Sequence, residues 1–337
     1  MTGRTFHRRS VVLFGICLVL VSVLAAGCVF VSTKGLLSRG PQPREETVLF
    51  GQGKDKILFM EIKGLISERK SSKPFQLQVE PSMVASVKEQ LDMAAGDDRV
   101  KGILLMINSP GGTVTASDII YNEIRRFKAA KQVKVVALLN GTATSGAYYI
   151  AQAADQILAY PTTVTGSIGV ILLNLNLNGL MEKIGVSNAT IKSGMYKDLG
   201  SPFRQPEEGE KEILQGVVDE LHGRFVQVVG ENRRALKLSD HPDLVDGRIF
   251  TARQALSEGL IDQIGYVADA VGWVREAAAA PDARVVRYQR RGDYLPNMYS
   301  YGRDQAFQAE FNVIKLDLEG FLSGVGPTFM YLWMPGA

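Results

Sequence analysis

The side chain best placed for chemistry is Ser145, which lies in the run NGTATSGAYYIA at 140–151. The apolar run 133–139 before it predicts a buried strand, and the small residues at 146–154 after it predict a helix. A serine at this junction is at a helix N-terminus, where free backbone N–H groups favour developing negative charge. Gly146 lets the backbone turn sharply and lets a substrate approach. These features fit a serine nucleophile, although on this stretch alone a helix-capping serine is the simpler interpretation.

A serine nucleophile needs a base, and the three histidines of the chain are poorly placed for that role. His7 precedes the N-terminal apolar segment, His222 lies within a long amphipathic pattern, and His241 lies in a polar loop beside a proline. In α/β folds, site residues typically follow strand ends or glycines, and neither His222 nor His241 does. The Ser-His-Asp route is therefore weakly supported.

Lysine is the other candidate base. Lys192 and Lys197 both lie in the segment KSGMYKD at 192–198, which follows a predicted strand. A lysine accepts a proton only when it is neutral, so its site must exclude water and lower its pKa. Nothing in the local sequence chooses between the two lysines or excludes an exposed loop lysine.

The segment Ser109-Pro110-Gly111-Gly112 follows another apolar run. One interpretation is a tight turn between a strand and a helix. The other is that backbone N–H groups beside Gly112 form part of an oxyanion hole, because two glycines let the main chain approach a tetrahedral intermediate. Such donors contribute about 3 kcal/mol each.

The sequence lacks the motifs of several other classes of enzyme. The chain has no HExxH and no GxxxxGK[ST], and its two cysteines, Cys17 and Cys28, both lie in the N-terminal apolar segment. A net charge of +3 spread over 337 residues does not indicate a nucleic-acid partner. We therefore predict no metal site, no cofactor and no nucleic-acid binding.

The N-terminus predicts attachment to a membrane. Basic residues precede the apolar run 11–31, which at roughly twenty residues is long enough to cross a bilayer. This order predicts a cytoplasmic N-terminus and an exported remainder. The segment LAAGC at 24–28 resembles a lipoprotein signal with Cys28 as the lipidated residue. We favour an uncleaved anchor, because the apolar run continues past Cys28.

Beyond the N-terminus, apolar strands alternate with amphipathic helices, which predicts an α/β fold with largely parallel strands. The segment 32–55 carries no periodicity and predicts a linker. Predicted strands lie at 57–66, 102–107, 133–139, 156–160, 168–173 and 189–191. Predicted helices lie at 83–95, 116–128, 146–154, 179–184, 207–230 and 267–279. The apolar tail 329–335 is too short to span a membrane, so we expect it to pack on the domain or on a neighbouring subunit.

Separated segments of the chain together resemble one family. They are Ser109 to Gly112, SGAYYIA from Ser145, TGSIGV at 165–170, YKD at 196–198 and the segment 247–265. In this order they resemble signal peptide peptidase A in its short form, a family of the Clp protease/crotonase superfamily. The resemblance covers roughly 57–280, and its combination of motifs is specific. Ala147 departs from the pattern, since many relatives have a second glycine there.

The resemblance implies a serine-lysine dyad with Ser145 as nucleophile and Lys197 as general base. It implies that the Ser167 hydroxyl hydrogen-bonds the lysine, and that amides near Gly112 and Gly146 form the oxyanion hole. Lys192 lacks the tyrosine before it and the aspartate after it that the family pattern requires.

The implied fold is a Clp/crotonase-like spiral of ββα units. We therefore expect an anchor or lipoprotein signal at 1–31, a linker at 32–55, a catalytic domain at 56–280 and a C-terminal extension at 281–337. The resemblance further implies a ring-like homo-oligomer that cleaves released signal peptides and similar extended peptides at the membrane. In one possible arrangement of this ring, each active site is built from residues of more than one subunit.

Other functions fit the same features less well. A crotonase-type acyl-CoA enzyme shares the fold, but coenzyme A is not expected outside the cytoplasm. A non-catalytic ring-forming membrane scaffold predicts no reactivity at Ser145. A related membrane-bound protease that processes quality-control partners has the same sequence features, so the substrate stays open.

Overall fold

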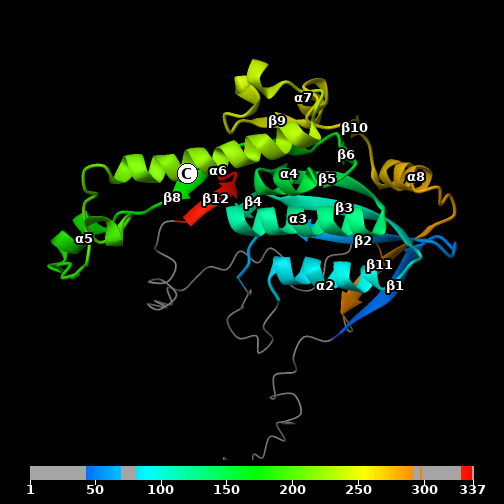
Figure 1. Cartoon of the computed structure of the whole chain (residues 1–337), viewed down its shortest axis with the longest axis horizontal. Helices are drawn as coiled ribbons and strands as arrows, with labels where there is room; N and C mark the ends of the chain where they lie inside the picture. The colour runs from blue at the N-terminus through cyan, green and yellow to red at the C-terminus, as the bar shows by residue number, and fades with distance from the viewer. Residues whose placement is uncertain (1–42, 70–80, 291–296, 298–327, 336–337) are drawn as a thin grey trace, which may run out of the picture. The chain divides into compact units, whose positions relative to one another are not determined.

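A largely parallel sheet built from apolar strands forms the centre of the fold (Figure 1). The computed structural model describes residues 43–69, 81–290, 297 and 328–335. The main path of the sheet runs, in order, through β1 (Arg44–Phe50), β11 (Arg284–Arg290), β2 (Lys56–Lys63), β3 (Val100–Ser109), β5 (Lys134–Thr144), β6 (Gln156–Ala159) and β10 (Gln263–Ile264). Along this path β1 is antiparallel to β11, and the other neighbours are parallel. The short strand β7 (Val164–Gly166) pairs parallel with the end of β5 and antiparallel with β9 (Ile249–Thr251).

Both faces of this sheet are buried, which explains why its central strands are continuously apolar. On β3, Ile103 and Leu105 belong to one apolar cluster, whereas Leu104 and Met106 belong to another. The first cluster includes side chains of α2 (Met83–Ala95), α3 (Val114–Lys131), α4 (Gly146–Ala151) and α6 (Glu210–Asn232). The second cluster includes side chains of α8 (Val267–Ala277). The described α/β architecture agrees with the alternation seen in the sequence.

A second, small sheet lies at the C-terminal end of β3. It consists of β4 (Gly111–Thr113), β12 (Thr328–Leu332) and β8 (Ile171–Leu173), with β12 in the middle and antiparallel to both neighbours. The tail predicted to pack on the domain therefore does so as a strand.

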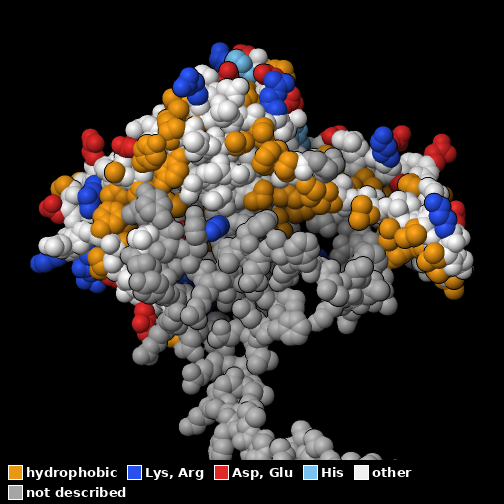
Figure 2. All heavy atoms as spheres, turned by 180° about the vertical axis from the view of Figure 1, so that it is seen from behind, with side chains coloured by type: hydrophobic (Ala, Val, Ile, Leu, Met, Phe, Trp, Pro, Cys, Tyr) orange, Lys and Arg blue, Asp and Glu red, His pale blue; other side chains and the backbone are white. Residues whose placement is uncertain are grey.

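Residues 174–209, which we call the arm, lead from β8 to α6 (Figure 1). The arm contains α5 (Asn178–Lys183) and the 3₁₀ turn η2 (Met195–Asp198), neither of which has a buried residue. Figure 2 shows hydrophobic side chains gathered at this end of the molecule, on the right of that view. The exposed large apolar residues of the arm are Leu175, Leu180, Ile184, Val186, Ile191, Met195 and Tyr196. The segment after α6 contains η3 (Leu238–Asp240), η4 (Pro242–Leu244) and α7 (Ala252–Ser257).

Three sequence predictions need correction. Part of the predicted linker, Arg44–Phe50, is the strand β1, which is paired with β11 from the other end of the domain. The predicted strand at 189–191 is absent from the described residues of the arm, where these positions are exposed loop. The predicted strand at 168–173 is strand only at Ile171–Leu173.

The predicted anchor at 1–31, with Cys17, Cys28 and His7, lies outside the described residues. Among the helices that the structure describes, none combines the length and apolar character needed to span a bilayer.

A buried lysine joins β1 to the rest of the sheet. The Lys56 side chain is 3% exposed, and its Nζ lies 2.5 Å from Glu46 Oε2 and 2.6 Å from Asp97 Oδ2. Burial by itself raises the pKa of Asp97, but hydrogen bonds from Lys56 and Arg99 outweigh burial and hold this pKa well below its usual range.

We expect Lys56→Met to lower the free energy of unfolding at pH 7 by about 1–3 kcal/mol, because Glu46 and Asp97 both lose their ion pair with the buried Lys56 ammonium group. The folded-state pKa of Asp97 lies below the unfolded value, so this stabilisation is present above about pH 4 and is lost as the pH falls further. Urea unfolding at pH 7 and pH 3 measures both values, with the exposed Lys134→Met as control. An equal difference at both pH values would contradict this account.

Candidate active site

Ser145 occupies a strained backbone position between β5 and α4. Its φ of 55° and ψ of −117° lie outside the regions that residues with a side chain favour. Two hydrogen bonds hold this bend: the Ser145 N–H donates to the Gly166 carbonyl at 2.7 Å, and the Tyr149 N–H donates to the Ser145 carbonyl at 2.9 Å. Strained conformations persist where the surrounding structure fixes them, and they concentrate at functional sites.

The Ser145 hydroxyl is buried and unpaired. The residue is 1% exposed, and its Oγ has no hydrogen-bond partner among the described residues. Ser145 is the N-cap residue of α4, but its side chain makes no capping hydrogen bond, so capping does not explain the serine at this position. A buried hydroxyl without a partner loses the hydrogen bonds that water would give it. A role of the hydroxyl in a reaction would explain why the fold tolerates this loss of hydrogen bonds.

Ser167 lies next to this bend because β7 runs alongside the end of β5. Gly166 pairs with Thr144, and the Ser167 N–H donates to the carbonyl of Arg248 at 2.7 Å. Gly166 and Ser167 both have positive φ, at 83° and 53°. Ser167 is 6% exposed. The structure thus places Ser167 one residue beyond the carbonyl that holds Ser145, and its contact with a lysine stays a prediction.

Gly112 and Gly146 lie close together at the same place. A methyl group on Gly146 would stand 3.3 Å from the Gly112 nitrogen and 2.4 Å from the Ser117 hydroxyl oxygen. A methyl group on Gly111, where φ is 105°, would stand 3.0 Å from the Gly146 nitrogen. The absence of side chains on Gly111 and Gly146 therefore lets β4 approach the start of α4. The backbone nitrogens of Gly112 and Gly146 thus lie near each other beside Ser145, and their role as an oxyanion hole stays a prediction.

The strand β12 passes directly beside these glycines. Tyr331 pairs with Gly112 on one side, and Met330 pairs with Ile171 on the other. A methyl group on Gly111 would stand 2.0 Å from the Tyr331 carbonyl oxygen. An extended backbone thus lies in the groove between β4 and β8, with one of its carbonyl groups against Gly111 and Gly146.

The side chain of Tyr331 fills an aromatic pocket. It is fully buried, and its ring lies 5.2 Å from that of Tyr149 in a stacked arrangement and 4.7 Å from that of Phe225. Its hydroxyl donates to the Leu221 carbonyl at 2.8 Å. Burial and a hydrogen bond to Asp118 raise the pKa of Tyr149 well above its usual range, so its hydroxyl stays protonated.

This pocket is not apparent from the sequence alone. Tyr149 was visible as part of the helix after Ser145, and the apolar tail suggested packing somewhere. Phe225 lies in α6, far along the chain, and only the fold brings it to Tyr149 and Tyr331.

The structure does not bring Lys197 to Ser145 within the described chain. Lys197 is exposed in η2, whereas Ser145 Oγ is buried without a partner. The same observation applies to His222 and His241, neither of which reaches the hydroxyl. His222 Nε2 is itself buried without a partner among the described residues.

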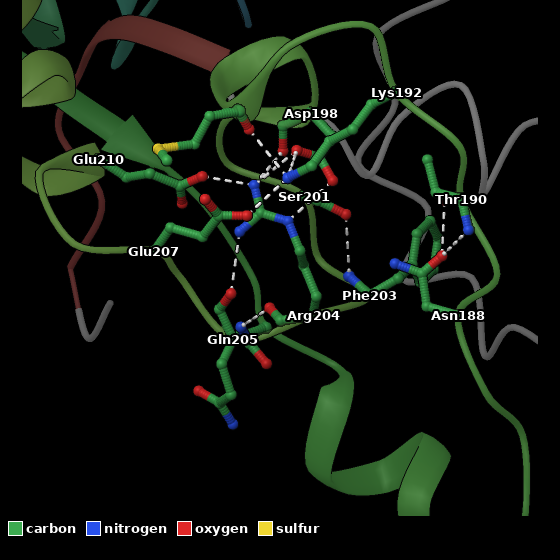
Figure 3. Close-up of polar contacts among 12 residues, drawn as sticks. Asn188, Thr190, Lys192, Asp198, Ser201, Phe203, Arg204, Gln205, Glu207 and Glu210 are labelled. Carbon is green, nitrogen blue, oxygen red and sulfur yellow. Dashed lines mark hydrogen bonds and ion pairs between the residues drawn. The ribbon is translucent and has the colours of Figure 1, made fainter.

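Lys192, the competing base, is committed to ion pairs. Its Nζ lies 2.5 Å from Glu207 Oε1 and 2.9 Å from Asp198 Oδ1 (Figure 3). Hydrogen bonds to Glu207 and then Asp198 raise the pKa of Lys192 above its ordinary value. A lysine held protonated cannot accept a proton, so the geometry disfavours Lys192 as the base.

Comparison with known proteins gives consistent matches. The model of peptidase family S49 matches residues 127–280, and that of Clp protease matches residues 64–164. The chain is 38% identical over 245 residues to a protein of Enterococcus faecium assigned as signal peptide peptidase SppA, which covers 73% of this chain and 70% of that protein. It is 39% identical to a protein of Methanocaldococcus jannaschii assigned as a protease, over 59% of this chain and 63% of that protein. It is 31% identical to Protease 4 of Salmonella typhi, over 59% of this chain and 32% of that protein.

The strained bend at Ser145 predicts a measurable difference between two substitutions. Glycine adopts positive φ readily, so Ser145→Gly should be more stable than Ser145→Ala by about 1 kcal/mol. Thermal or urea unfolding of the two variants measures this difference. The matched pair at Ser86, within helix α2, should show the opposite order, because glycine costs about 1 kcal/mol relative to alanine in a helix. The same order at both positions would argue against strain at Ser145.

Proposed function

Because this chain belongs to peptidase family S49 and is a serine protease, we propose that Ser145 is its nucleophile and Lys197 its general base. One observation carries the assignment of Ser145: its buried, unpaired hydroxyl stands at a strained bend, with Gly112 and Gly146 and an extended peptide strand beside it. The strand β12 models how a peptide substrate would bind, as an added antiparallel strand between β4 and β8.

The proposed reaction begins when neutral Lys197 accepts the proton of the Ser145 hydroxyl while that oxygen attacks the carbonyl carbon of a peptide bond. The amides of Gly112 and Gly146 donate hydrogen bonds to the developing oxyanion. The C–N bond then breaks, and Lys197 returns the proton to the leaving amine. Water hydrolyses the acyl-enzyme by the same sequence of proton transfers. The Ser167 hydroxyl would orient Lys197 through a hydrogen bond.

We propose that the dyad forms between neighbouring subunits of a homo-oligomeric ring. Two observations support this arrangement. Lys197 is exposed on an arm that carries many exposed apolar side chains, whereas the Ser145 hydroxyl is buried in the body and has no hydrogen-bond partner among the residues that the structure describes. Contiguous exposed apolar residues commonly mark a protein interface. An arm that docks on the next subunit would bury these side chains and bring Lys197 close to Ser145 of that subunit.

We propose extended, apolar peptides as substrates, including released signal peptides at a membrane. The aromatic pocket around Tyr149 and Phe225, which here holds Tyr331, supports a preference for a large side chain near the cleaved bond. The apolar run at 11–31 supports a tether with the N-terminus in the cytoplasm and the domain exported. Lipidation at Cys28 is the alternative form of that tether.

The nucleophile can be tested with a serine-reactive fluorophosphonate on the detergent-solubilised full chain, with the adduct located by mass spectrometry. We expect labelling at Ser145 that rises with pH, because only a neutral base activates the serine. Lys197→Ala should slow labelling by about 10²–10⁴-fold, whereas Lys183→Ala, on the same arm, should label like the wild type. Absence of labelling in the assembled wild type would contradict the protease mechanism and favour a non-catalytic scaffold.

The shared site predicts complementation. Neither Ser145→Ala nor Lys197→Ala should cleave a peptide alone, but co-assembly of the two in equal amounts should restore about a quarter of the wild-type sites. Peptide cleavage by the co-expressed mixture measures this recovery, and mixing the two after separate assembly provides the control. If Ser145 and Lys197 of one chain formed the dyad, the co-expressed mixture would stay inactive.

A further inference from the structure

The turn that carries Lys197 is not held by apolar packing. The two residues before Lys197 are largely exposed, with Met195 at 59% and Tyr196 at 43%. A 3₁₀ turn of four residues has poor hydrogen-bond geometry and little stability of its own. Other interactions must therefore define where the backbone of Lys197 lies.

Those interactions come from a cluster of charged side chains on the flanks of the turn (Figure 3). Arg204 grips Asp198, the residue after Lys197, with both prongs of its guanidinium: Nε lies 2.8 Å from Oδ2, and Nη2 lies 2.7 Å from Oδ1. Arg204 Nη2 also donates to the backbone carbonyl of Asp198 at 3.0 Å. This fork fixes both the position and the orientation of Asp198.

The same guanidinium is anchored to the first turn of α6. Arg204 Nη2 pairs with Glu210, whose side chain is 3% exposed. Since α6 packs against the body through Phe225, Val228 and Val229, this pair links the turn to a fixed element. On the other flank, Lys192 Nζ donates to the Met195 carbonyl at 2.8 Å and pairs with Asp198. The backbone is thus held on both sides of Lys197.

Lys197 itself stays outside the cluster. The two cations, Lys192 and Arg204, are shared among the carboxylates of Asp198, Glu207 and Glu210. Among the described residues, Lys197 Nζ makes no hydrogen bond or ion pair with any of them. The cluster therefore holds the backbone and leaves the Lys197 ammonium group available.

We propose that Arg204 is a positioning residue for Lys197, acting through Asp198 and Glu210, an inference that rests on the proposed role of Lys197 as general base. In this role Arg204 acts on Lys197 through Asp198 and needs no contact with the substrate. Its ion pairs hold the exposed turn at 195–198 in one conformation and so fix the backbone of Lys197. Displacing a catalytic group by about 1 Å can slow a reaction about 100-fold, so loss of these ion pairs should lower the rate of the reaction at Ser145.

The test measures the rate of fluorophosphonate labelling at Ser145 in the assembled full chain as a function of pH. We expect Arg204→Met to slow labelling about 10–100-fold and to move the midpoint of labelling to higher pH, since a lysine that spends more time in water is harder to neutralise. Arg204→Lys should stay slow, because it keeps the charge and loses the fork. Arg44→Met is the matched control, since Arg44 also pairs with a carboxylate and a backbone carbonyl but lies in β1.

Glu210→Gln separates positioning from a simple charge effect. Removing Arg204 takes away a positive charge near Lys197, whereas Glu210→Gln takes away a negative charge and preserves the side-chain shape. If the cluster acts only by charge, the two variants should shift the pH midpoint in opposite directions, which would overturn the proposal. If it positions Lys197, both should slow labelling. Glu210→Gln also provides the test if Arg204→Met fails to assemble, as judged by sedimentation.

A double-mutant comparison ties the effect to Lys197. In a Lys197→Ala background, Arg204→Met should slow the residual labelling no further, because the group that Arg204 positions is gone. An equal slowing in both backgrounds would overturn the proposal and indicate a general effect on the fold. If Arg204→Met were labelled at the wild-type rate, the positioning role of Arg204 would be overturned and the role of Lys197 would stand. If Lys197→Ala were labelled at the wild-type rate, Lys197 would not be the general base.

Discussion

The structure depends on one backbone constraint, the bend at Ser145 between β5 and α4. A residue with a side chain adopts this conformation only if its neighbours hold it there. The Gly166 carbonyl accepts the Ser145 N–H, and Gly146 starts α4 at a position where the Ser117 hydroxyl leaves no space for a methyl group. The buried helix α4 then fixes the bend from the other side. The parallel sheet and the apolar clusters on its two faces hold the residues that make these short-range contacts in fixed positions.

The small sheet places an extended segment of the chain, β12, beside that bend. Strands β4 and β8 are each three residues long, and the edges that face each other both pair with β12. Isolated strand edges of this kind readily accept another strand. In the described structure β12 provides it, and the aromatic ring of Tyr331 enters the pocket formed by Tyr149 and Phe225. In the described structure β12 is thus held both by backbone pairing and by one large aromatic pocket.

The local parts of this arrangement could be predicted from the sequence. The helix at 83–95 was predicted with its observed bounds, and Ser145 was placed correctly on a strand-to-helix turn, because both follow from periodicity and small residues nearby. The strand β1 was missed because its seven residues, REETVLF, carry little alternation, and its partner β11 lies at the other end of the domain. The aromatic pocket was also missed, because its residues lie far apart in the sequence. The choice between Lys192 and Lys197 could not be made from local sequence, because only the fold brings Glu207 to Lys192.

The pairing of β1 with β11 has a mechanical consequence. Arg44 lies opposite Arg290, so the polypeptide enters and leaves the main sheet at one corner. In the sheet order, β11, β2 and β3 separate this corner from β5, which ends at Ser145. Tension applied to the chain before Arg44 would first peel β1 from β11 along its hydrogen bonds. Such a force would therefore act on β1 before it reached β5, and the conformation of Ser145 would stay unchanged while β1 is pulled.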